Sequence, residues 1–154
     1  MGYFMRFFVT GDVPLTIEAI GAALQAQDPA YHVENTAIPD LCELYHGALY
    51  LGELEISRPD EEIFREELDE LKTLVTRTPG ENAPRVLDTL EHTRLMVVMD
   101  ALWQDDTEES AQEVFAALDP LWDWLFVSAG GLLHYDTDGF YDAETLILEM
   151  NVRP

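Results

Sequence analysis

Aromatic and acidic side chains occur together in the last third of the chain, and they are its strongest candidates for chemistry. Aromatic rings beside carboxylates suit cationic, amphipathic ligands or the Lys and Arg side chains of a partner, because a ring face attracts a cation. Asp100 also interrupts a nearly continuous apolar run, where a carboxylate must face solvent, a basic partner or a pocket. The alternative is that most of these rings are core. The candidate ligand-binding residues are Asp100, Trp103, Trp122, Trp124, His134, Tyr135 and Tyr141.

Catalytic chemistry has weaker support. Nucleophilic catalysis lacks its usual pattern, because the chain has no Gly-x-Ser-x-Gly elbow and a lone cysteine such as Cys42 is usually an inert buried residue. Acid–base chemistry by Asp100, His134 or His46 is the alternative to a binding function. We therefore predict no catalytic residue and keep an acid–base enzyme as the alternative.

The acidic residues around Asp136–Gly139 do not match a calcium loop. With Gly139 at the sixth position, the first ligand would be His134 and the twelfth Thr145, so the register fails. An Asp-Gly pair is instead typical of a hairpin turn. The histidines and the one cysteine have no zinc spacing, and Gly130-Gly131 lacks the longer pattern of a phosphate loop. We expect neither a metal nor a cofactor.

The charge balance limits the classes of partner. The chain has 154 residues, with 31 Asp and Glu against eight Lys and Arg. Between Leu95 and Val152 there are thirteen acidic residues and no Lys or Arg. Such a surface repels nucleic acid and anionic membranes. Three interpretations remain: solvation or salt adaptation, an acidic face for a basic protein or cationic small molecule, and DNA mimicry, for which the helix Asp60–Val75 is the best candidate surface.

Compartment and membrane association follow from simple features. A single cysteine excludes an internal disulfide framework and fits a reducing compartment. No apolar run approaches the length of a membrane span. The N-terminal run lacks a basic region and a cleavage site, so it predicts a strand and not a signal peptide. The expectation is a soluble cytoplasmic protein.

Hydrophobic periodicity predicts six strands and several helices. The strands are Tyr3–Thr10, Tyr31–Glu34, Leu44–Ser57, Leu95–Trp103 and a pair joined across Asp136–Gly139. Helices are predicted from a Thr16 cap to Asp28, after a Ser57 cap with the stripe Phe64, Leu68, Leu71 and Val75, over Pro84–His92, and over Thr107–Leu118. Pro120 predicts a kink before a further short helical segment.

The order of these elements repeats. Residues 3–57 and 94–152 both read as strand–helix–strand–strand, with a helical insert over residues 58–93. We predict one α+β domain, residues 1–154, with a ferredoxin-like duplication: an antiparallel sheet of about six strands and helices mainly on one face. This topology resembles the effector-binding domains related to bacterial DNA gyrase inhibitor. The resemblance implies a groove between the repeats that binds small, often cationic and apolar ligands.

The leading hypothesis is a non-catalytic binding or regulatory module that recognises a basic protein surface or a cationic amphipathic ligand. We expect its binding surface to be the aromatic and acidic face of the last third, without direct nucleic-acid or membrane binding. An acid–base enzyme and an acidic DNA mimic are the alternatives. A homodimer is expected if a hydrophobic sheet face is left uncovered.

Overall fold

The computed structural model describes residues 2–150, which form eight antiparallel strands in one sheet and four α-helices. The end of the second predicted repeat, at residue 152, lies outside the described residues. Along the sheet the strands follow the order β2-β3-β4-β5-β1-β6-β7-β8. The elements are β1 (Gly2–Val9), α1 (Ile17–Gln27), β2 (Tyr31–Asn35), β3 (Leu41–His46), β4 (Leu49–Ser57), α2 (Glu62–Thr76), α3 (Ala83–Glu91), β5 (Leu95–Leu102), α4 (Glu108–Ser128), β6 (Gly131–Tyr135), β7 (Gly139–Tyr141) and β8 (Leu146–Glu149).

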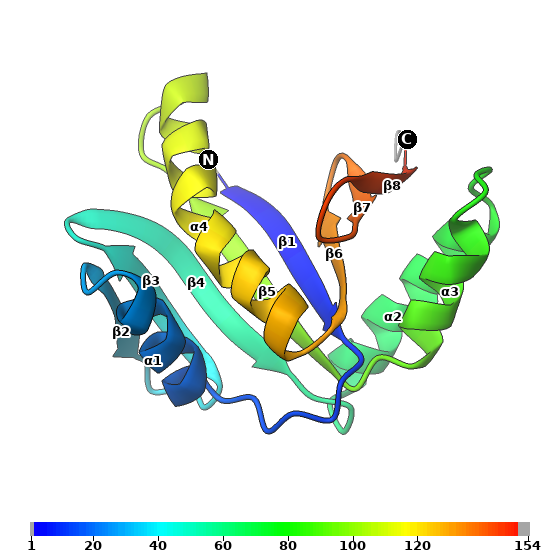
Figure 1. Ribbon diagram of the computed structural model, residues 1–154, viewed down its shortest axis with the longest axis horizontal. Helices are drawn as coiled ribbons and strands as arrows, with labels where there is room; N and C mark the ends of the chain where they lie inside the picture. The colour runs from blue at the N-terminus through cyan, green and yellow to red at the C-terminus, as the bar shows by residue number, and fades with distance from the viewer. Residues whose placement is uncertain (1, 151–154) are drawn as a thin grey trace.

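Two hydrophobic cores form, one on each face of the sheet. Strand β1 contributes to both, because successive side chains point to opposite faces: Phe7 enters one core and Phe8 the other. Helices α1 and α4 cover the first core, and α2 and α3 cover the second. In Figure 1, α4 lies in front of β5 and runs beside β1, whereas α2 and α3 lie at the right-hand end of the molecule. The prediction of helices mainly on one face was therefore wrong.

The sheet has eight strands where six were predicted. The segment predicted as one strand, Leu44–Ser57, belongs to a hairpin of β3 and β4 that turns at Gly47, whose φ is 60°. A register shift at Leu44/Tyr45 then buries Leu51 in the first core. The other additional strand is β8, a short edge strand that pairs with β7. Alternation of apolar residues runs across a tight turn without a break, so periodicity could not separate β3 from β4.

The helix boundaries were predicted with two errors. Thr16 caps α1 as predicted, since its hydroxyl accepts a hydrogen bond from the Ala19 amide at 3.1 Å. Ser57, in contrast, is the buried last residue of β4, and α2 begins at Glu62. Helix α4 continues through Pro120 to Ser128 although proline removes one backbone hydrogen bond. Burial of Leu118, Leu121 and Leu125 on both sides of Pro120 holds the helix together.

The second core leaves part of its sheet face without helices. Its buried residues come from α2, α3, strands β1, β5, β6, β7 and β8, and Met150 directly after β8, and none comes from β2, β3 or β4. On this uncovered part four carboxylates lie directly opposite one another on adjacent strands. We call them the carboxylate row: Glu34, Glu43, Glu53 and Asp100.

Neighbouring strands are about 4.8 Å apart, and like charges directly opposite each other destabilise a sheet. Partial desolvation raises the pKa of Asp100, the last carboxylate in the row. The uncovered face also carries the exposed ring of Phe4, which lies opposite Asp100. The carboxylate row is thus a feature that costs the folded state some stability.

Replacing Glu53 with glutamine should raise the free energy of unfolding by roughly 0.5–1 kcal/mol, because Glu53 lies between Glu43 and Asp100. Urea denaturation at low salt measures this effect, and 1 M salt should shrink it by screening. The control is Glu149→Gln, since Glu149 is also on a strand but lies opposite Gly139. An equal gain from both substitutions would mean that net charge, and not the row, is responsible.

Candidate functional site

The structure separates the seven candidate residues into several places. Trp122, Tyr135 and Tyr141 lie together in an open groove beside α4. Trp103 lines a different cavity, which also contains residues of the first turns of α4. The other three residues lie elsewhere: Asp100 in the carboxylate row, His134 in a small cavity beside α2, and Trp124 partly buried against the first core. The seven residues therefore do not line one common cavity.

The open groove, about 510 Å³ in volume, runs between α4 and strands β6, β7 and β8. We call it the acidic groove because four of its lining residues are carboxylates and none is Lys or Arg. Aromatic rings of α4, β6 and β7 supply much of the remaining wall. The lining residues are Asp119, Trp122, Asp123, Phe126, Leu133, Tyr135, Tyr141, Asp142, Ala143, Glu144, Thr145 and Leu146.

Packing fixes the rings of the groove in place. The Trp122 indole is 2% exposed and lies parallel to the Phe7 ring, with centroids 6.5 Å apart. Phe126 packs edge-on against the same Phe7 ring at 4.8 Å. Tyr135 and Tyr141, on neighbouring strands, have centroids 5.1 Å apart. The aromatic wall is therefore preformed by the first core and does not depend on a ligand to order it.

The loop after β7 forms the opposite rim of the groove. Asp142 holds this loop, because its Oδ1 accepts hydrogen bonds from the amides of Glu144 and Thr145 at 2.9 and 2.8 Å. These two hydrogen bonds lower the pKa of the Asp142 carboxyl, and Arg85 at 3.5 Å contributes further. Asp142 thus has a structural task, which leaves Asp119, Asp123 and Glu144 as the carboxylates available to a ligand.

Electrostatic strain is present on the α4 side of the groove. Partial desolvation raises the pKa of Asp119, and the nearby charge of Asp123 raises it further. Burial raises the pKa of Tyr135, and the Asp119 charge adds to this effect. Each of these shifts means that negative charge is unfavourable here and that a cation would stabilise the ionised carboxylates.

Trp122 adds an unpaired donor to the groove wall. Its Nε1–H is buried and has no hydrogen-bond partner among residues 2–150. An unsatisfied buried donor costs about 1–3 kcal/mol, so most such groups in proteins are paired.

The candidate residues include three of the four rings of the groove, Trp122, Tyr135 and Tyr141, but not the carboxylate pair Asp119 and Asp123. The two are four residues apart, a spacing that places them on the same side of a helix. That signal was present, but the predicted kink at Asp119–Pro120 concealed it, because a broken helix has no common side. The continuous α4 brings the two carboxylates together.

His134, the candidate base, lies in a cavity of about 160 Å³ on the opposite sheet face. Arg6 lies beside it and is held by Glu67 at 2.9 Å and Asp136 at 3.6 Å. Burial, assisted by the charge of Arg6, lowers the pKa of His134 to about 4. The imidazole is therefore neutral and weakly basic near pH 7, whereas efficient general bases have pKa values near the working pH.

His46 does form an acid–base pair, but on the surface. Its Nε2 lies 2.8 Å from Asp28 Oδ2, and this hydrogen bond lowers the pKa of the Asp28 carboxyl. In the part of the chain that the structure describes, no three His, Cys, Asp or Glu side chains are placed to hold a metal ion. Among the same residues, no helix is both long and apolar enough to span a bilayer.

Comparisons with protein-family models, with curated proteins and with solved structures gave no match to this chain.

Proposed function

We propose that this protein is a non-catalytic binding module that recognises a basic segment of a partner protein through the acidic groove. The observation that carries the proposal is the assembly of Trp122, Tyr135 and Tyr141 with three available carboxylates, Asp119, Asp123 and Glu144, in a groove lined by no Lys or Arg among residues 2–150. Arginine or lysine side chains fit this chemistry, because they pair with carboxylates and stack on aromatic rings.

Electrostatics supports a cationic partner over a solvation role for these carboxylates. Solvation places acidic side chains where water surrounds them, and a fully solvated carboxylate keeps its usual pKa. The pKa of Asp119 is instead raised by desolvation and by Asp123. A bound guanidinium or ammonium group would replace this repulsion by attraction.

One feature supports a peptide segment over a simple cation. The groove is lined by five separate elements or loops, namely α4, β6, β7, residues 142–145 and β8, so an extended chain would contact several of them at once.

The test uses a short fluorescent peptide with two arginines and a counterpart in which both are replaced by neutral citrulline. The double substitution Asp119→Asn with Asp123→Asn should weaken binding of the arginine peptide roughly tenfold, since each lost ion pair is worth about 0.2–1 kcal/mol and cation desolvation adds to it. Fluorescence anisotropy at low and moderate salt measures the dissociation constant. The citrulline peptide should bind far more weakly.

A charge-matched control separates the groove from general acidity. The double substitution Glu43→Gln with Glu53→Gln removes the same charge from the carboxylate row and should leave binding almost unchanged. Equal weakening by both double variants would show non-specific attraction to a polyanion. If only the Glu43→Gln, Glu53→Gln variant bound the arginine peptide more weakly, the peptide would bind at the carboxylate row and not in the groove. Either result contradicts the proposal.

The alternatives have less support. An acid–base enzyme would use His134, whose lowered pKa makes it a poor base, or the His46–Asp28 pair on the surface. DNA mimicry would use the exposed carboxylates of α2 together with the carboxylate row. Displacement of duplex DNA from a DNA-binding protein, lost in the Glu43→Gln, Glu53→Gln variant, would favour mimicry over the groove.

A duplication origin also remains a proposal. It is supported by the common order of elements after β1 and after β5, a helix followed by three strands. The two units occupy different places in the sheet, however: β2 is an edge strand, whereas β6 pairs with β1. Duplication would be supported by related sequences in which the two halves of the chain align with each other residue by residue. Related sequences in which the two halves show no such similarity would oppose it.

A further inference from the structure

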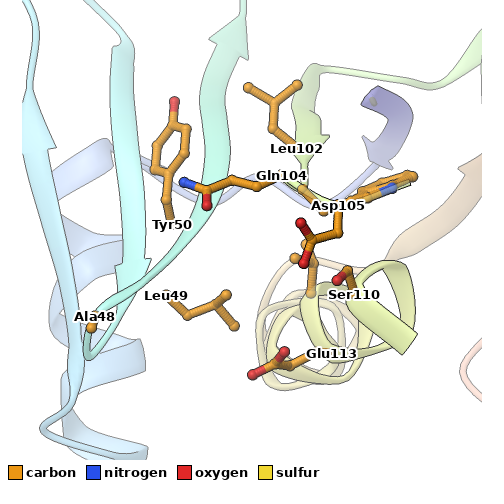
Figure 2. Close-up of a pocket in the computed structure, with 10 residues that line it drawn as sticks. Ala48, Leu49, Tyr50, Leu102, Gln104, Asp105, Ser110 and Glu113 are labelled. Carbon is orange, nitrogen blue, oxygen red and sulfur yellow. The ribbon is translucent and has the colours of Figure 1, made fainter. Parts of the chain in front are cut away.

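A second cavity, about 390 Å³ in volume, lies on the other flank of α4 from the acidic groove. It forms where the start of β4, the end of β5 and the first turns of α4 come together. Figure 2 shows Leu49 and Tyr50 on one side and Ser110 and Glu113 on the other. Its volume is in the range of small-molecule sites. The lining residues are Ala48, Leu49, Tyr50, Leu102, Trp103, Gln104, Asp105, Ser110, Glu113 and Val114.

The apolar part of this cavity is anchored on both sides. Trp103 packs edge-on against Phe115 of α4, with ring centroids 5.6 Å apart. On the β4 side Leu49 packs against the first core, whereas the Tyr50 ring contacts Tyr45, 5.1 Å away, at the edge of the cavity. Val114 is fully buried and joins the cavity to the first core. These contacts hold an aromatic and aliphatic lining that an apolar group can enter without rearrangement.

The polar groups around the lining are acceptors or neutral. Asp105 and Glu113 supply carboxylates, Ser110 a hydroxyl and Gln104 an amide, which in Figure 2 extends toward Tyr50. The lining contains no Lys or Arg. The pKa of Tyr50 is raised to about 12, first by burial and then by Glu43, so the neutral phenol persists at physiological pH.

Two opposite electrostatic effects act at this cavity: the N-terminus of a helix attracts anions, whereas carboxylates attract cations. Helix α4 begins here, with Thr107 Oγ1 accepting a hydrogen bond from the Ser110 amide at 3.2 Å. A helix N-terminus is equivalent to about half a positive charge. Five carboxylates lie within residues 105–113, namely Asp105, Asp106, Glu108, Glu109 and Glu113. The negative charge therefore exceeds the helix dipole several-fold, and an anionic ligand is disfavoured.

We propose that this cavity binds a small amphipathic organic cation, an ammonium or guanidinium group attached to an aromatic or branched apolar body. The apolar body lies against Trp103, Leu49 and Val114. The cation pairs with Glu113 and Asp105, and Ser110 and Gln104 supply further hydrogen bonds. The site is independent of the acidic groove, because the two have no lining residue in common.

The probe is 2-phenylethylammonium, with 2-phenylethanol as its neutral counterpart of nearly equal shape. Titration followed by ¹H–¹⁵N NMR should give saturable shifts at the Trp103 indole and at the Gln104 and Ser110 amides. The expected dissociation constant is roughly 1 mM or tighter. The alcohol should bind at least several-fold more weakly, because it loses the carboxylate pairing.

Two variants locate the site. Glu113→Gln, on the exposed side of α4, should weaken binding of the ammonium probe roughly 3- to 5-fold without disturbing the fold. Leu49→Trp should abolish binding by filling the cavity. Glu144→Gln in the acidic groove is the charge-matched control and should leave the affinity unchanged.

Three outcomes would overturn the proposal: equal affinity for the alcohol and the ammonium, shifts centred on Trp122 and Tyr141, or no saturable shift at either site. Because the arginine peptide and the ammonium probe report on separate residues, failure here leaves the groove proposal standing, and the reverse also holds.

Discussion

Replacing Gly131 with alanine is expected to destabilise the protein by about 3–5 kcal/mol, or to prevent folding. Gly131 opens β6 with φ 137°, a conformation that other residues rarely adopt. A Cβ built at this position would overlap the carbonyl oxygen of Phe8 on β1. The β1–β6 pairing would have to move apart, and this pairing positions both Leu133 and Tyr135 in the wall of the acidic groove.

Gly47→Ala is the control for a positive-φ glycine that has open space around it. Gly47 also has positive φ, at 60°, but nothing lies within 4 Å of a Cβ built there. This substitution should cost only about 1 kcal/mol. Urea denaturation of both variants measures the difference. Similar losses for the two would mean that strain, and not the close approach of β1 and β6, governs the response at Gly131.

Lowering the pH from about 6.5 to 4 should reduce the free energy of unfolding by roughly 3 kcal/mol through protonation of His134. Burial lowers the pKa of His134 in the folded protein to about 4, from an ordinary value of 6.5. Between these values the unfolded chain binds a proton at His134 and the folded protein does not. The unfolding free energy contributed by this residue is therefore fully present above pH 6.5 and falls as the pH decreases toward 4.

His134→Phe isolates this effect from the carboxylates, which also titrate in this range but are common to both proteins. Phenylalanine keeps an aromatic ring against Phe140, whose centroid lies 4.7 Å from that of the imidazole. It also removes the unpaired buried Nδ1 atom. The difference in stability between variant and wild type should grow as the pH falls from 6.5 to 4. Parallel stability curves would show that His134 does not have the lowered pKa.

Local patterns predicted most helices and strands correctly. The stripe Phe64, Leu68, Leu71 and Val75 is buried on α2, and the continuous apolar run after Arg94 is the central strand β5. These predictions succeed because amphipathic periodicity depends on which side of one element meets the core. The errors at Gly47 and Pro120 arise where a turn or a helix is decided by contacts with distant residues.

Only part of the binding surface followed from residue types. The sequence indicated that rings and carboxylates of the last third could bind a cation, and Trp122, Tyr135 and Tyr141 do meet in one groove. Trp103, nineteen residues before Trp122, lies in a separate cavity on the other flank of α4. The distance between two residues in the sequence does not show on which flank of α4 each one lies. That depends on the continuous helix α4, which Pro120 was expected to break.

Composition and periodicity determined by themselves an acidic α+β protein whose last third combines aromatic rings with carboxylates. Only the tertiary structure decided how those residues divide: into an open groove, a separate cavity and a carboxylate row on a helix-free sheet face. The physical reason is that strand order and register pair residues far apart in the chain. Glu34, Glu43, Glu53 and Asp100 become neighbours through three antiparallel pairings that no local pattern specifies.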